Sequence, residues 1–292
     1  MKIALAQYPI GKFASLDEWK ANAARWVEEA ADAGAKLLVF PEYGGMELTS
    51  LLPEALQQDL RGQIPALEQF HRDFLLTYDL LSKKHRVAIS APSLPVLSCE
   101  RGPIVNRVYR FWNDGFEYQD KRQMTRFEKE RWGITGGNML KMLDIGEAKL
   151  GIAICYDIEF PLIAHAMARA GADLILAPSC TDTLAGANRV HVGARARALE
   201  NQVYVAVAPT VGNAPWSPAV DVNTGWAAVY ATPDIGFPDD GTLVRGERDK
   251  PGWVYADLDF DLLRRARRHA QVFTRADWET QHLPDLKVNG TL

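Results

Sequence analysis

The segment GAKLLVFPE, residues 34–42, recurs in related form as GADLILAPS, residues 171–179. Each copy follows a stretch predicted to be helical and gives Gly-Ala, a charged residue, a short apolar run, then proline and a polar residue. An apolar run of this length is typical of a strand that is covered on both faces. The repeat predicts an α/β protein with two similarly built halves, although this order of elements is common in α/β proteins and does not fix the topology.

The sequence around the first copy predicts strand, helix, strand. Residues 2–8 form an apolar run, and residues 15–33 carry apolar side chains at helical spacing, with Ser15 and Glu18 as a capping box and Gly34 as the C-cap. Predicted strands and helices continue to follow one another along the chain, and a β-hairpin is expected at Asn113-Asp-Gly. The further elements predicted are helices at 65–84, 161–170 and 189–200, and strands at 36–40, 86–90, 105–112, 116–118, 139–143, 150–155, 174–177 and 204–208.

No linker or low-complexity stretch divides the chain, so we expect one domain over residues 1–273. Residues 274–292 form a tail that we expect to pack on a neighbouring subunit. The tail contains Trp278 and the segment from His282 to Leu286.

The composition and net charge of the chain indicate which kinds of binding partner to expect. The 292 residues are 47% hydrophobic and carry a net charge of −4, which argues against nucleic acid and anionic membrane surfaces and favours small molecules or proteins as partners. The partner we expect is a small-molecule substrate. There is no run of 18 apolar residues and no signal-like start. The three cysteines include no CxxC pair, so we expect no disulfide scaffold, no metal site and a cytoplasmic location.

Polar residues follow several of the predicted buried strands, which is where α/β sheets place their ligands. Glu42 follows the run KLLVF and Pro41, Cys155 ends the run LGIAI, and residues 179–182 come at the end of the run LILA, while Lys121 comes after the hairpin. Taken singly, each residue has a non-catalytic explanation. Cys155 would be a small buried thiol, Glu42 a carboxylate in a loop, and Lys121 a solvated surface lysine. These residues could act together in catalysis only if the fold brings their side chains into one site.

The histidines offer no obvious base for Cys155. His165 and His191 fall within predicted helices, and no histidine ends a predicted buried strand. A Cys-His pair stays open, but the sequence directs the search for a base elsewhere.

Three segments together resemble the signature segments of the nitrilase superfamily of carbon-nitrogen hydrolases. They are LLVFPEYGG (37–45), YQDKRQMTRFEKERWGITGGN (118–138) and GIAICYDIEFP (151–161), and GADLILAPS (171–179) and ARARALENQVYVAVAPTVG (194–212) agree in the family's order. The resemblance implies a four-layer α-β-β-α sandwich. It also implies Glu42 as general base, Lys121 as catalytic lysine and Cys155 as nucleophile, with the Tyr156 N–H as an oxyanion donor.

The family also has a second glutamate between the lysine and the cysteine. Counting seven residues back from Gly137 gives Glu130, which we favour over Glu128, although Gly136 stands where the family usually has proline. Glu128, Trp132, Ser179 and Thr181 are further candidates for the substrate pocket. No cofactor or metal is implied.

The activity implied is hydrolysis of a small-molecule amide through a cysteine thioester. Hydrolysis of an N-carbamoyl amide or a nitrile by the same residues is the alternative, and a non-catalytic binding or scaffold protein is the alternative of another class. The resemblance further implies a homodimer or higher homo-oligomer.

Overall fold

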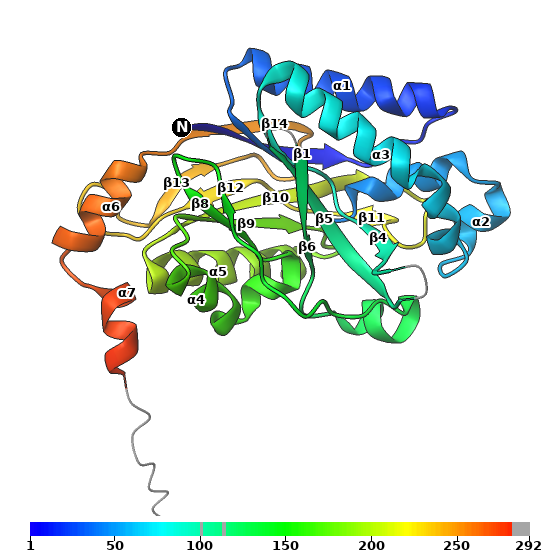
Figure 1. The fold of residues 1–292 in the computed structure, drawn as a ribbon. Coiled ribbons are helices and arrows are strands. Elements are labelled where there is room, and N and C mark those ends of the chain that lie inside the picture. The colour runs from blue at the N-terminus through cyan, green and yellow to red at the C-terminus, as the bar shows by residue number, and fades with distance from the viewer. Residues whose placement is uncertain (100–101, 113–114, 282–292) are drawn as a thin grey trace, which may run out of the picture.

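The computed structural model describes residues 1–99, 102–112 and 115–281. In Figure 1, helices α1 and α3 cover one side of the strands, and α4 and α5 cover the opposite side. Two layers of strands lie between these helices. The four-layer α-β-β-α architecture predicted from the resemblance is therefore confirmed.

The first sheet is built around β1 (Lys2–Pro9), the apolar run at the start of the chain. β1 pairs in parallel with β2, which pairs in parallel with β3, and β14 pairs antiparallel along the other edge of β1. Its other strands are β2 (Leu37–Val39), β3 (Ala88–Ser90), β4 (Leu94–Leu97), β5 (Ile104–Trp112), β6 (Gly115–Asp120) and β14 (Gly252–Asp257).

The second sheet is built around β9 (Leu174–Ser179), the apolar run of the second copy of the repeat. It pairs in parallel with β8 and β10. The other strands are β7 (Leu143–Asp144), β8 (Lys149–Ile152), β10 (Tyr204–Asn213), β11 (Val222–Asn223), β12 (Ala228–Tyr230) and β13 (Thr242–Arg245). The sheets meet where Tyr8 and Pro9 of β1 pair with Thr210 and Val211 of β10.

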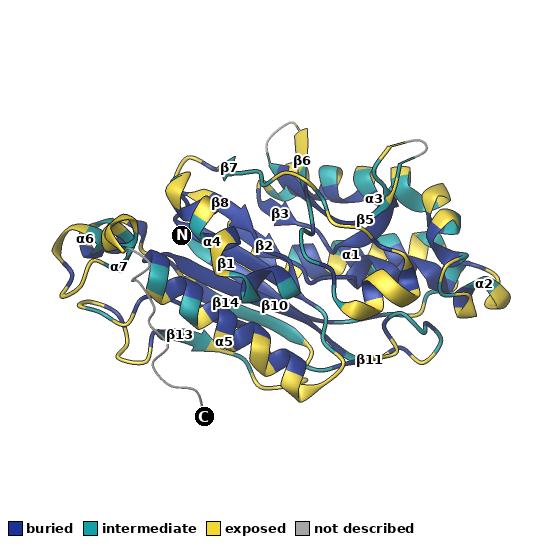
Figure 2. Cartoon of the chain, turned by 90° about the horizontal axis from the view of Figure 1, so that it is seen from below, coloured by how far each residue is buried: buried dark blue, intermediate teal, exposed yellow. Residues whose placement is uncertain are grey.

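Alternate residues of β1 face two different cores. Ile3 and Leu5 belong to a buried cluster that includes β9 and α5, whereas Ala4 and Tyr8 belong to a cluster with Trp19 of α1. Successive side chains of a strand point to opposite faces, so a strand between two apolar layers is apolar throughout. The dark blue strands of Figure 2 show this burial.

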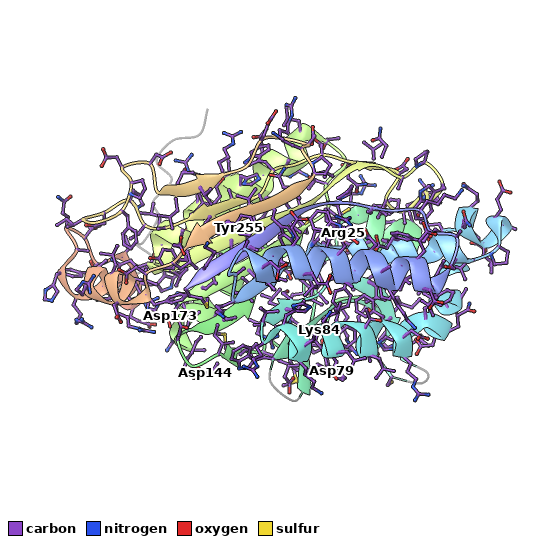
Figure 3. The ribbon with its side chains drawn as sticks, turned by 90° about the horizontal axis from the view of Figure 1, so that it is seen from above. Arg25, Asp79, Lys84, Asp144, Asp173 and Tyr255 are labelled. Carbon is purple, nitrogen blue, oxygen red and sulfur yellow. The ribbon has the colours of Figure 1, made fainter. Side chains whose placement is uncertain are left out.

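All four predicted helices are present, although α5 begins five residues earlier than predicted and α2, α6 and α7 were not predicted. Ser15 caps α1 by accepting the N–H of Glu18 at 3.2 Å, as the capping pattern predicted. Figure 3 shows α1 beside α3, where Lys84 of α3 donates to Glu28 of α1 at 2.6 Å. The helices are α1 (Leu16–Asp32), α2 (Glu54–Gln58), α3 (Gln63–His85), α4 (Pro161–Arg169), α5 (Leu184–Asn201), α6 (Phe260–His269) and α7 (Thr274–Asp277); the 3-10 helices are η1 (Gly44–Leu51), η3 (Cys155–Glu159) and η4 (Trp278–Thr280), and η2 (Phe127–Trp132) is a π-helix.

Two predicted strands are placed wrongly. The strand expected at 139–143 shrinks to β7, and Met139 is largely exposed, so its apolar side chain did not mark a buried run. The strand expected at 150–155 ends at Ile152, and Cys155 instead begins η3. Within the predicted hairpin, residues 113–114 lie outside the described residues.

The start of the tail packs on its own chain. Trp278 stacks on His165 of α4 with ring centroids 4.2 Å apart, and Arg275 donates to the backbone oxygen of Ala172 at 3.1 Å. The segment from His282 to Leu286 lies outside the described residues, so an arm on a neighbouring subunit stays a prediction. Among the helices described, none is long and apolar enough to cross a membrane.

Candidate active site

The structure brings together the three residues that the sequence singled out. Glu42 comes three residues after β2, Lys121 directly follows β6, and Cys155 begins η3 beyond β8. Lys121 Nζ lies 2.7 Å from Glu42 Oε1, and both side chains are 1% exposed. Cys155 is buried in the wall of the same cavity. Sheet topology thus collects residues 113 positions apart around one small space.

The second glutamate of this cluster is Glu128, so the preference for Glu130 is wrong. Lys121 Nζ donates to both carboxylate oxygens of Glu128 at 2.8 Å. Glu130 is on the outer face of η2, 56% exposed, where it pairs with Arg126 at 3.0 Å. Counting residues back from a glycine could not find this, because the π-helical turn decides which glutamate points inward.

Glu128 is held as a carboxylate by several donors. Tyr43 Oη donates to Oε1 at 2.6 Å, and the Thr125 N–H and hydroxyl donate to Oε2 at 2.8 and 2.9 Å. Burial alone would raise the pKa of Glu128, but Lys121 and these donors lower it below its ordinary value. The opposing carboxylates in turn raise the pKa of Lys121, so the ammonium is charged despite its burial.

Glu42 has a different environment from Glu128. Its Oε1 accepts from Lys121 and from Asn106 Nδ2 at 2.9 Å, and its Oε2 accepts the Cys180 N–H at 3.0 Å. Burial raises the pKa of Glu42 to about 7, an effect that Lys121 opposes and the Glu128 charge reinforces. A carboxyl group with this pKa can accept and return a proton near neutral pH.

Cys155 sits in a constrained backbone. Its φ of 48° is in the left-handed region, which is uncommon for residues other than glycine. Asp157 anchors the turn by accepting the N–H groups of Ile154 at 3.1 Å and Gln123 at 2.7 Å. Burial, with the nearby Glu42 carboxylate, raises the pKa of the Cys155 thiol well above its usual range. At neutral pH the Cys155 side chain is therefore a protonated thiol.

The Tyr156 N–H is the first backbone donor after Cys155. It lies in the first turn of η3, where N–H groups have no partner within the helix. The Tyr156 ring packs edge-on against Phe160, with centroids 4.9 Å apart.

The cavity above these residues has a volume of about 340 Å³. Its aromatic wall includes the predicted Trp132, which packs against Tyr43 with ring centroids 4.7 Å apart. The charged residues Arg126, Asp182, Arg189 and Asp221 also line it.

Two other pocket predictions are wrong. Ser179 is buried and its hydroxyl donates to the backbone oxygen of Ala177, while the Thr181 hydroxyl donates to that of Thr224 at 2.7 Å. Their neighbours Cys180 and Asp182 line the cavity instead. In an extended segment alternate side chains face opposite ways. The prediction therefore identifies the correct segment but selects the side chains that point away from the cavity.

Sequence reasoning also missed Tyr43, Thr125 and Asn106. Asn106 carried little signal, because β5 also contains Arg107 and Arg110 and is therefore not a purely apolar run. Across the described part of the chain, no three side chains of His, Cys, Asp or Glu are grouped in a way that would hold a metal ion.

Because Glu128 neutralises a buried cation, we expect Glu128→Gln to lower the free energy of unfolding by about 3 kcal/mol. The matched variant Glu130→Gln removes an exposed carboxylate and should change it by less than about 0.5 kcal/mol. Urea denaturation at pH 8 measures both values. Equal effects of the two substitutions would contradict the assignment of Glu128 to the buried cluster.

Comparison with known proteins identifies the family of the chain. The family model for carbon-nitrogen hydrolases matches residues 2–268. A probable hydrolase of Bacillus subtilis, YhcX, is 33% identical over 273 residues, covering 93% of this chain and 52% of its own length. The chain thus spans about half the length of that relative.

Two further comparisons cover most of the chain. A chloroplastic omega-amidase of Arabidopsis thaliana is 27% identical, covering 84% of this chain and 64% of the relative. The crystal structure of Saccharomyces cerevisiae Nit3, from branch 10 of the nitrilase superfamily, shares the fold with a TM-score of 0.72, at 24% identity, covering 92% of this chain and 93% of Nit3. With the family model matching nearly its whole length, the chain belongs to the carbon-nitrogen hydrolase family, as the sequence resemblance predicted.

Proposed function

We propose that this protein hydrolyses the carbon–nitrogen bond of a small amide and releases ammonia or an amine. The observation that carries the proposal is the meeting of a buried thiol, a carboxyl group with a pKa of about 7 and a buried ammonium around one cavity. These are the nucleophile, base and charge-stabilising group that acyl transfer needs. The name of the Arabidopsis relative, an omega-amidase, supports an amide as substrate.

In the first half of the proposed reaction, Cys155 Sγ attacks the amide carbon while Glu42 takes the thiol proton. The carbonyl oxygen becomes an oxyanion, which the Lys121 ammonium and the Tyr156 N–H stabilise. As the tetrahedral intermediate collapses, the carbon–nitrogen bond breaks and Glu42 returns the proton to the leaving nitrogen. Ammonia or an amine departs, and the acyl group stays on Cys155 as a thioester.

In the second half, Glu42 takes a proton from a water molecule that attacks the thioester. Collapse of the second intermediate breaks the carbon–sulfur bond and returns the proton to Cys155, so the acid product leaves and the thiol is restored. Glu42 must therefore act as base and as acid in turn. Its pKa near neutrality suits both tasks, because neither protonation state is strongly disfavoured.

N-carbamoyl amides and nitriles are the alternative substrates for the same residues. The volume of about 340 Å³ suits a small acyl group in every case. Ammonia release from short amides, omega-amides, N-carbamoyl compounds and nitriles, measured side by side, distinguishes these classes.

We expect Cys155→Ala to lower turnover of the best substrate by roughly 10⁴-fold or more, because the thioester cannot form. Cys99→Ala is the matched control, since Cys99 is exposed and should leave turnover unchanged. Steady-state ammonia release measures both. Retained turnover in a folded Cys155→Ala protein would contradict the mechanism.

The alternative of another class is a binding or scaffold protein with a retired site. We expect brief treatment with a haloacetamide to modify Cys155 before Cys99, despite the burial of Cys155, because Glu42 can take its proton. Intact-mass spectrometry with peptide mapping gives the order of modification. A scaffold without an active base predicts the reverse order, with the exposed Cys99 reacting first.

We also propose a homo-oligomer that pairs through α4 and α5. Leu162 and Val192 on these helices are 71% and 69% exposed, so each helix presents a large apolar side chain to water, and Figure 2 shows the face that these helices form. We expect Val192→Glu to reduce the sedimentation coefficient at micromolar concentration. Leu80→Glu, at an exposed leucine of α3 on the opposite face, should not. A wild-type protein that sediments only as a monomer would refute the proposal.

A further inference from the structure

Asn106 bonds to two residues that meet at the cavity: to the side chain of Glu42 and to the backbone of Lys121. It lies in β5 and is fully buried. Its side-chain Nδ2 donates to Glu42 Oε1 at 2.9 Å, and its backbone oxygen accepts the Lys121 N–H at 2.9 Å. One residue therefore links the position of the carboxylate to the position of the lysine.

The bond from Asn106 bears directly on how the Glu42 carboxylate is oriented. The terminal torsion of a glutamate is broad, so hydrogen bonds rather than rotamer preference must fix the plane of its carboxylate. Glu42 receives three donors from three separate segments: Lys121, Asn106 and the Cys180 N–H. Without Asn106, Oε1 would keep only Lys121, whose ammonium is also bound to both oxygens of Glu128.

The Asn106 amide has no other task that the structure reveals. Its Oδ1 is buried and has no hydrogen-bond partner among the described residues, and its Nδ2 bonds only to Glu42. Burying an amide with an unsatisfied oxygen is costly, and an apolar side chain would pack in β5 without that cost. Such a group is expected where a specific polar contact matters more than packing.

The Asn106 amide carries no charge, and this affects the pKa of Glu42. A second cation beside Glu42 would lower its pKa towards that of an ordinary carboxylate and weaken it as a base. A second carboxylate would raise the pKa and keep Glu42 protonated. An amide donates one hydrogen bond to the ionised form, which favours that form modestly and adds no charge to a cluster that already holds three ionisable groups.

We propose that Asn106 is a positioning residue that aims the Glu42 carboxylate at Cys155 and stabilises its ionised form. The inference rests on the proposed function, in which Glu42 is the base for Cys155. It concerns how that base is held, and it applies whichever amide, N-carbamoyl compound or nitrile is the substrate.

The test follows alkylation of Cys155 by iodoacetamide as a function of pH, in a Cys99→Ala background, so no substrate is needed. For the wild-type site we expect the rate to rise with pH and level off above about 7, as Glu42 ionises. In Asn106→Leu the ionised carboxylate loses a donor, so the midpoint should move up by about one pH unit and the plateau rate should fall.

Asn106→Asp serves as a second variant that keeps the shape of the side chain. It replaces the donor with a carboxyl group beside Glu42, so the midpoint should rise further than in the leucine variant. Asn201→Leu is the matched control: Asn201 is a buried amide of α5 whose Nδ2 donates to the backbone oxygen of Arg197 at 3.1 Å. It should keep the wild-type midpoint.

Thermal unfolding confirms that each variant is folded before its curve is read. If the leucine variant does not fold, Asn106→Ala, which removes the donor without adding a charge, takes its place. Midpoints that rise in both Asn106 variants, with the control unchanged, support the inference. Wild-type midpoints in folded Asn106 variants overturn it and leave the proposed function intact. A wild-type protein with no inflection near neutral pH, and with Cys155→Ala active, overturns the proposed function itself.

Discussion

The buried ammonium of Lys121 between two carboxylates is the interaction on which the site depends. Any one of the three charges would be very unfavourable alone at this depth. Lys121 bonds both oxygens of Glu128 and one oxygen of Glu42, so its charge is shared unequally. Glu128, with additional donors, stays ionised, and Glu42 is left with a pKa of about 7. Two chemically identical groups thus acquire different roles from their surroundings.

The two-sheet architecture is what makes this cluster possible. Glu42 extends from the first sheet beyond β2, whereas Cys155 and Cys180 extend from the second sheet beyond β8 and β9. The Cys180 N–H donates to Glu42 Oε2 at 3.0 Å, a direct bond between residues from the two sheets. The parallel pairing of β1 with β10 brings both sets of strand ends to one place. The two copies of the repeated segment therefore end beside the site: the first ends at Glu42, and the second ends directly before Cys180.

Sequence reasoning identifies the site residues that come after predicted strands. It misses those whose inward or outward direction is set by the local backbone conformation. Glu42, Lys121 and Cys155 were found because strand ends and family order both mark them. Glu130 was preferred to Glu128 because residue counting carries no information about a π-helical turn. Ser179 and Thr181 were chosen from the correct segment, but the alternation of side chains placed Cys180 and Asp182 in the cavity.

The raised pKa of Cys155 decides what kind of thiol chemistry the site supports. Many thiol enzymes lower the pKa of the nucleophile, so that a thiolate waits for the substrate. Here burial and the Glu42 carboxylate keep the proton on sulfur, and none of the described residues that line the cavity is a histidine. In the proposed mechanism, attack by the thiol and transfer of its proton then occur together, which makes the orientation of Glu42 as important as its basicity. The left-handed backbone of Cys155 and the three donors that hold Glu42 fix the two ends of that transfer. In the proposed mechanism the base therefore depends on the neutral and charged donors around Glu42, and we expect a change in those donors to alter the reaction even where Cys155 is unchanged.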